Sequence, residues 1–387
     1  MSEYQYYEFL ALDRPLTEAE QAEIRELSTR ARITATSFTN EYEWGDFKGS
    51  PELMMQRYYD AHLYLANWGT HRIMLRLPRT LLDPETVGQY CVDGWVSVSA
   101  MHEHVILDLT SEDEAGDWEE GAEDSLSAIV GVRSELAAGD LRALYLAWLS
   151  AYSGWEDGEE PFGEDREELE PPVPAGLGAL TAAQRALAGF LRVDPCLLQA
   201  AAGASPALPE VTGDARLLAA YVRQLPADDK DRLLMLVVRN QAGRARMELL
   251  RGMRTEPDKG LGTQPRRTMA ELLDTAAGLR AERDRQAAAE ASARRALREQ
   301  QRAAARQRRL DELARDPEAA WAQARKLIGT KAPARYDEAV TLVLDLRDLA
   351  RREDQVGEFE QRFAILRDEH TRKPSLIARF AQAGLTS

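Results

Sequence analysis

The pattern of hydrophobic and polar positions changes along the chain from mixed to purely helical. In the first 153 residues, alternating or β-branched runs typical of strands stand between runs with helical spacing. The expected elements are strands at Tyr4–Leu10, Arg32–Phe38 and His71–Leu77, a hairpin at Trp95–Leu109, and helices at Thr17–Ser28, Pro51–Trp68, Ser125–Ala137 and Leu141–Tyr152. This order predicts an α+β domain in which helices pack on or beside a sheet.

Beyond residue 178 every periodic run has helical spacing. Thr181 with Gln184, and Thr268 with Glu271, form capping-box patterns that start helices. The helix that starts at Thr268 meets no proline before Pro317, so it is expected to run for about 48 residues, or about 70 Å. Further helices are expected from Pro195 and at Asp228–Arg254, Pro317–Ile328, Tyr336–Arg351, Glu358–Glu369 and Ser375–Ala383. The second part is therefore predicted to be an all-α half with one long charged helix.

Residues 154–178 differ in composition from both neighbours, since they hold nine acids, one arginine and four prolines. Such a segment buries little surface and its like charges repel, which predicts a linker or mobile loop. The expected domains are an α+β domain at 1–153, this linker at 154–178, a helical domain at 179–262, the long helix at 263–315 and a C-terminal helical module at 316–387.

Charge is distributed unevenly over the 387 residues, whose formal net charge is -16. Residues 251–387 carry 28 basic and 22 acidic side chains, whereas residues 1–250 carry 21 basic and 43 acidic ones. Arginine supplies 43 of the 49 basic residues, a bias that fits a GC-rich bacterial genome. No apolar run approaches the roughly 18 residues that would cross a bilayer, and no signal peptide is apparent, which predicts a cytoplasmic protein without membrane partners.

The long helix contains a stretch rich in arginine, RRALREQQRAAARQRR. The candidate nucleic-acid-binding residues are Arg294, Arg295, Arg298, Arg302, Arg306, Arg308 and Arg309. Three interpretations stay open: a helix that is solvated or packs on a partner, an internal contact with the acidic half, and binding to nucleic-acid phosphates. Few of the a and d positions of the heptad frame are apolar, which disfavours a homodimeric coiled coil. Residues 264–320 contain no aromatic side chain to stack on a nucleic-acid base.

A candidate ligand or catalytic site lies in the first domain, where Trp44, Lys48, Asp60 and His62 would supply an acid, a base and a cation. Aromatic residues at helical spacing are usually core, and a lysine in a turn is usually solvated, so a structural or partner-binding surface is the alternative. Sequence motifs for nucleotide-binding loops, nucleophile elbows and zinc proteases are absent.

No metal or other cofactor is expected. His102 and His104 could face one ion if both lay on one strand face, but no motif supplies a third ligand among His62, His71 and Cys91, and a hairpin turn explains the pair equally well. Two cysteines, Cys91 and Cys196, are too few for a four-cysteine zinc site. The acidic run 112–124 lacks the spacing of a calcium loop and is expected to be a solvated loop.

The C-terminal run Ala332–Leu385 carries a Tyr-Asp-Glu-Ala-Val opening, a Leu-Arg-x-x-His helix end, an Arg-Lys pair and a final Ala-Gly-Leu. In these features it resembles the helical tail of bacterial SWIM zinc-finger proteins, while the YQYYEF start is similar to that of a bacterial family without assigned function. The Cys-x-Cys and Cys-x-His zinc ligands of the SWIM finger are absent, so zinc and finger-mediated DNA binding do not carry over. The resemblance implies a docking module, with a SWIM zinc-finger protein as the partner or with a partner that both proteins share.

The sequence thus predicts a non-enzymatic adaptor or scaffold of a bacterial multi-protein assembly that acts through protein contacts. One alternative is an accessory nucleic-acid-binding protein that uses the arginine-rich helix. The other is an enzyme of unnamed reaction with a site near Lys48 and His62.

Overall fold

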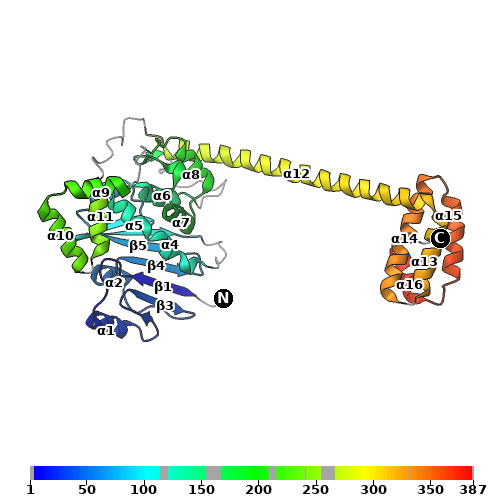
Figure 1. Ribbon diagram of the computed structural model, residues 1–387, viewed down its shortest axis with the longest axis horizontal. Helices are drawn as coiled ribbons and strands as arrows, with labels where there is room; N and C mark the ends of the chain where they lie inside the picture. The colour runs from blue at the N-terminus through cyan, green and yellow to red at the C-terminus, as the bar shows by residue number, and fades with distance from the viewer. Residues whose placement is uncertain are drawn as a thin grey trace. The chain divides into compact units, whose positions relative to one another are not determined.

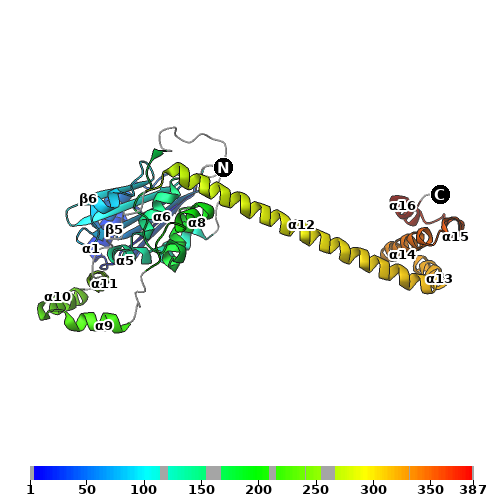
Figure 2. The ribbon, with the colours of Figure 1, turned by 90° about the horizontal axis from the view of Figure 1, so that it is seen from above.

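The computed structural model describes residues 4–113, 121–153, 167–208, 215–239, 241–253, 266–330 and 332–385. These residues form two compact units, residues 1–282 and 283–387 (Figures 1 and 2). The first contains an antiparallel sheet with helices, and the chain beyond it is helical, which confirms the predicted α+β and all-α parts. Among the described residues, no helix combines the length and the apolar character needed to span a membrane.

Seven antiparallel strands form one sheet in unit 1, in the order β2-β3-β1-β4-β5-β7-β6. Their bounds are β1 Gln5–Leu10, β2 Arg32–Ile33, β3 Ser37–Tyr42, β4 Ala61–Ala66, β5 His71–Pro78, β6 Val96–Met101 and β7 His104–Ser111. The predicted strands at the start of the chain and at 71–77 and the hairpin at 95–109 are confirmed. The predicted strand Arg32–Phe38 is instead two strands, β2 and the start of β3, which pair with each other.

The expected helix Pro51–Trp68 is wrong over most of its length. Helix α2 Pro51–Arg57 starts at the Ser50 cap but ends after seven residues, and β4 follows it. Strand β4 pairs with β1 on one side and β5 on the other, and five of its six residues are buried. A central strand covered on both faces has no alternation of polar and apolar positions, so its sequence pattern does not distinguish it from a buried helix.

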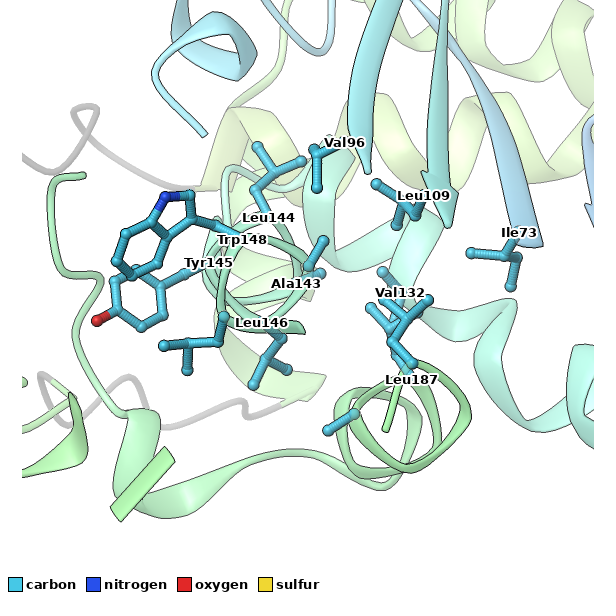
Figure 3. Packing of buried hydrophobic residues seen from close by; sticks show 14 of the residues in the cluster. Ile73, Val96, Leu109, Val132, Ala143, Leu144, Tyr145, Leu146, Trp148 and Leu187 are labelled. Atoms are coloured by element: carbon cyan, nitrogen blue, oxygen red, sulfur yellow. The ribbon is translucent and has the colours of Figure 1, made fainter. Parts of the chain in front are cut away.

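Helices cover both faces of the sheet. Tyr7 and Phe9 of β1 face a core beneath α1 Glu18–Leu27 and α2, whereas their neighbour Tyr6 faces the larger core on the other side. The larger core lies beneath α3 Pro84–Gly88, α4 Ser125–Ile129, α5 Gly131–Ala137, α6 Arg142–Ser150, α7 Ala182–Phe190 and α8 Pro195–Ala202. Every residue of α6 is buried, and Figure 3 shows its Leu144 and Trp148 in this core.

In place of the two helices expected at 125–152, the structure has three, α4, α5 and α6. A short 3-10 helix, Ala122–Asp124, precedes α4, and another, Leu177–Ala179, precedes α7. Helices α9 Ala215–Gln224, α10 Ala227–Val238 and α11 Ala242–Met253 follow α8. The single helix expected at Asp228–Arg254 is thus two, α10 and α11. Met247 of α11 reaches the larger core.

Part of the expected linker 154–178 is packed structure, while its residues 154–166 lie outside the described part of the chain. Glu170 is buried. Its carboxylate accepts a hydrogen bond from the Tyr145 hydroxyl and forms an ion pair with Arg267 at 2.7 Å. Leu177 lies in the same core as residues of the sheet and of α7 and α8. The expected domain boundary between residues 178 and 179 would therefore divide this core. The segment is ordered here because Glu170 pairs with Tyr145 and Arg267 and the Pro172 carbonyl accepts a hydrogen bond from Tyr90.

Helix α12 Met269–Arg315 is continuous over 47 residues, as predicted. Thr268 and Glu271 cap it reciprocally, with Thr268 N–H donating to the Glu271 carboxylate at 3.0 Å and Glu271 N–H donating to Thr268 Oγ1 at 3.2 Å. Unit 2 continues with α13 Pro317–Gly329, α14 Pro333–Arg352, α15 Val356–Asp368 and α16 Pro374–Gln382, which share a core around Trp321, Phe363 and Phe380. These four helices match the predicted ones within three residues at each end.

Candidate functional site

The four residues of the predicted ligand site do not form one site. Trp44 and Lys48 lie exposed in the loop before α2, where the Arg30 guanidinium stacks 5.2 Å from the centre of the Trp44 ring. Asp60 and His62 are buried, with exposed fractions of 1% and 0%. The exposed pair and the buried pair therefore cannot contact one ligand as the acid, base and cation of an active site.

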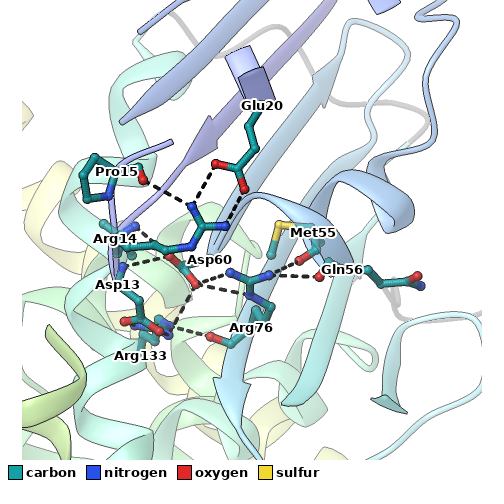
Figure 4. A network of polar contacts seen from close by, with 10 residues as sticks. Asp13, Arg14, Pro15, Glu20, Met55, Gln56, Asp60, Arg76 and Arg133 are labelled. Carbon is teal, nitrogen blue, oxygen red and sulfur yellow. Dashed lines mark hydrogen bonds and ion pairs between the residues drawn. The ribbon is translucent and has the colours of Figure 1, made fainter. Parts of the chain in front are cut away.

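Asp60 is the centre of a buried polar network (Figure 4). Its Oδ2 accepts the backbone N–H groups of Leu12 at 2.7 Å and Asp13 at 2.8 Å, and its Oδ1 accepts from Arg76 Nη2 at 2.8 Å. Arg133 of α5 lies 3.7 Å from the same oxygen and binds Asp13 with two hydrogen bonds of 2.8 and 2.6 Å. The network joins the segment after β1, strand β5 and helix α5.

This network makes Asp60 a structural anion rather than an acid or base catalyst. Burial by itself would raise the pKa of Asp60, but Arg133, Arg76 and the Asp13 N–H together hold that pKa below its usual value. The carboxylate stays ionised, and both of its oxygens already accept hydrogen bonds. Neither Arg76 nor Arg133 was predicted as a member of a site, although an arginine within the apolar strand run HRIMLRL was a signal for Arg76.

His62 is also held in a structural position. Its Nδ1 lies 2.9 Å from the Glu8 carbonyl oxygen, and its ring stacks on Phe9 with centroids 3.9 Å apart. Burial lowers the pKa of His62 to about 3, although the hydrogen bond to Glu8 opposes this. Within the described chain, its Nε2 has no hydrogen-bond partner. Because the His62 imidazole is fully buried and packs against the rings of Phe9 and Tyr7, a substrate cannot reach it.

The histidines of the β6–β7 hairpin lie in different environments. His102 occupies the turn with a φ of 46°, whereas His104 pairs with Met101 as the first residue of β7, so they do not share a strand face. His71 lies 2.8 Å from the Phe190 carbonyl oxygen through its Nδ1. The described residues contain no group of three or more His, Cys, Asp or Glu that could hold a metal. Residues 114–120 of the acidic run lie outside the described residues.

The seven candidate arginines all lie exposed on α12 but divide into two groups. Arg306 forms an ion pair with Asp348 of α14, and Arg309 Nε lies 2.5 Å from Asp345 Oδ2 of the same helix. No described carboxylate pairs with the others, Arg294, Arg295, Arg298, Arg302 and Arg308. We call these five the unpaired arginines.

A second exposed surface, which was not predicted from the sequence, lies on α10. Leu233 is buried, but Leu234, Met235, Val237 and Val238 are exposed, Val238 by 73%. The run LLMLVV places six consecutive apolar residues on every side of a helix, so only part of them can face a core. The length of this run was the signal that some of it would remain outside.

Comparisons with known proteins found no family model, no curated protein and no solved structure that matches this chain. Among the candidates, the buried pair Asp60 and His62 is neutralised within the fold, whereas the unpaired arginines are accessible and charged.

Proposed function

We propose that this protein is a non-enzymatic adaptor that binds an anionic macromolecular partner through α12. The observation that carries the proposal is the set of unpaired arginines, five cations on one exposed helix with no described acid to neutralise them. Arginine forms bidentate hydrogen bonds with carboxylates and phosphates, and it stays charged at every physiological pH. Such a surface binds anions but offers no group for proton transfer or nucleophilic attack.

The buried polar residues of unit 1 support the non-enzymatic part of the proposal. Asp60 is neutralised by Arg76 and Arg133, and His62 is enclosed by aromatic rings. Both contribute to the fold itself. The enzyme alternative near Lys48 and His62 is left without a shared site for its proposed acid, base and cation.

The adaptor would also need a protein contact, which we assign to unit 2. The resemblance of residues 332–385 to the tails of SWIM zinc-finger proteins supports a partner of that kind, or one shared with it. Helix α15 of this unit leaves Ile365 54% exposed beside its core residues Phe363 and Leu366. An Ile365→Lys variant is expected to lose such a protein partner without affecting the anionic one.

The test is affinity purification of the full-length protein from its host, with three forms compared. The wild type and the R306Q/R309Q control should retain the same stoichiometric partner, because these two arginines are already neutralised by α14. The R294Q/R295Q/R298Q/R302Q/R308Q variant should lose it. The proposal fails if the wild type is recovered alone, or if the five-arginine variant retains every partner.

A further inference from the structure

The unpaired arginines share one face of α12. Placed on a helix with 3.6 residues per turn, all seven arginines between residues 294 and 309 lie within an arc of about 160°. The opposite side carries small or uncharged residues such as Ala296, Gln300 and Ala303. Residues 291–309 contain seven arginines and one acid, Glu299, so this part of the helix is locally cationic although the whole chain carries -16.

Most of this part of the helix is accessible to solvent, and its end at Arg306 and Arg309 contacts α14. Residues 281–290 and 292–309 are exposed without interruption, and only Ala291 is partly buried. An α-helix with its side chains is about 10–12 Å across, which is close to the width of about 12 Å of the major groove of B-form DNA. No described element pairs with residues 292–305, so this stretch can enter such a groove, whereas a helix packed on a domain surface cannot.

The positions within the arc fit a groove bounded by two phosphate strands. Among the unpaired arginines, Arg308 lies at one edge of the arc that they cover and Arg295 at the other, so their side chains would reach opposite strands. Arg298 lies between them, and the intervening positions include the small residues Ala291 and Ala305, which would let the helix approach closely. The unpaired arginines lie between residues 294 and 308, or about 21 Å along the axis, which is enough to follow several phosphates.

From these observations we infer that α12 binds duplex DNA by lying in its major groove, with the five unpaired arginines on the phosphates. This inference rests on the proposed binding of an anionic partner. Single strands are disfavoured because residues 264–320 contain no aromatic side chain to stack on unpaired bases. Duplex RNA is disfavoured because its major groove is deep and narrow. Acids farther from the helix than about 10 Å are largely screened at 0.1 M salt.

Binding by phosphate contacts has a quantitative signature. Five phosphate contacts predict a slope of about -4.5 for the logarithm of the association constant against the logarithm of salt concentration. Two duplexes of unrelated sequence should bind alike. Since Arg306 and Arg309 already pair with Asp348 and Asp345, they should contribute little to this slope.

The experiment measures fluorescence anisotropy of labelled duplex DNA with the full-length protein, starting at about 50 mM salt. The matched variants are R298Q/R302Q, which removes two unpaired arginines, and R306Q/R309Q, which removes two paired ones. The first should reduce the magnitude of the slope by about 2, and the second should leave it unchanged. Circular dichroism should give the same helix content for all three proteins.

The results that overturn the inference are distinct from those that overturn the adaptor proposal. No binding to DNA at about 50 mM salt, equal binding to duplex RNA, or equal loss of slope in both variants rules out the groove contact. If poly-glutamate binds through the same arginines and DNA does not, the anionic partner is a protein, and the adaptor proposal stands. If neither binds and no host partner depends on these arginines, both fail.

Discussion

Arginine has opposite roles in the two units of this molecule. In unit 1, Arg76 and Arg133 are largely buried, and their guanidinium groups converge on Asp60. On the part of α12 in unit 2, five arginines are exposed and no described carboxylate pairs with them. A buried guanidinium has to be neutralised by the fold, because an unpaired charge inside costs several kcal/mol. An exposed one is solvated and remains available to an external anion.

The largest effect on folding is expected from Asp60→Asn, which leaves the largely buried Arg76 without its carboxylate, while Arg133 keeps Asp13. We expect unit 1 to lose about 3–5 kcal/mol of unfolding free energy. Urea titration with hydrogen exchange in β4 and β5 as the readout would measure it. Arg79→Ala, at an exposed site after β5, should stay within about 0.5 kcal/mol. Equal losses in the two variants would mean that the Asp60 network is not specially stabilising.

The second effect is a pH dependence from His62. Its pKa is lowered to about 3 in the folded protein, whereas an unfolded histidine has a pKa of about 6.5. Its contribution to stability is therefore complete above about pH 6.5 and falls by up to about 1.4 kcal/mol per pH unit as the pH decreases towards 3.

His62→Phe should remove this part of the acid sensitivity, measured as unfolding free energy between pH 7 and about pH 4.5. Phe9→Leu is the control, since it weakens the ring contact with His62 without removing a titrating group, and it should lower stability about equally at each pH. An unchanged pH slope in His62→Phe would show that other groups dominate the acid response.

A smaller effect is expected at the paired end of the arginine face. Arg306 and Arg309 are 64% and 52% exposed in their ion pairs with α14, so each pair is worth about 0.2–1 kcal/mol. R306Q/R309Q should lower the thermal midpoint of unit 2 slightly, and added salt should reduce the difference. A loss as large as that of Asp60→Asn would mean that these pairs are effectively buried.

The smallest effect on stability is expected for the unpaired arginines. Replacing all five by glutamine should leave the unfolding free energy within about 0.5 kcal/mol per site, because glutamine and arginine have similar helix propensities and no ion pair is lost. Thermal unfolding followed by circular dichroism would measure it. Strong destabilisation would show that these side chains hold the fold together, and the contrast with Arg76 and Arg133 would disappear.

Local signals in the sequence predicted local structure well. The capping boxes at Thr181 and Thr268 start helices as expected, since cap and helix lie within four residues of each other. The helix of 47 residues followed from an uninterrupted run of good helix formers. The errors occurred where long-range pairing decides, as in Ala61–Ala66, which is a strand because β1 and β5 flank it.

The candidate sites also show this difference between local signals and long-range pairing. The sequence identified the arginine face, because helical spacing alone gathers the seven arginines of residues 294–309 on one side of α12. It could not distinguish Arg306 and Arg309 from the rest, since their partners Asp345 and Asp348 come from another helix. Nor could it separate Asp60 and His62 from Trp44 and Lys48, because burial depends on which elements cover each position.

The sequence by itself determined the class of each half, the start of the capped helices and the continuous basic helix, because these depend on residues within a few turns of one another. Only the tertiary structure decided which charges are neutralised. Asp60 meets Arg133 across 73 residues of chain, and Glu170 meets Arg267 across 97. Such pairs form where the packing of distant elements excludes water, and no local pattern of residues specifies which elements will meet.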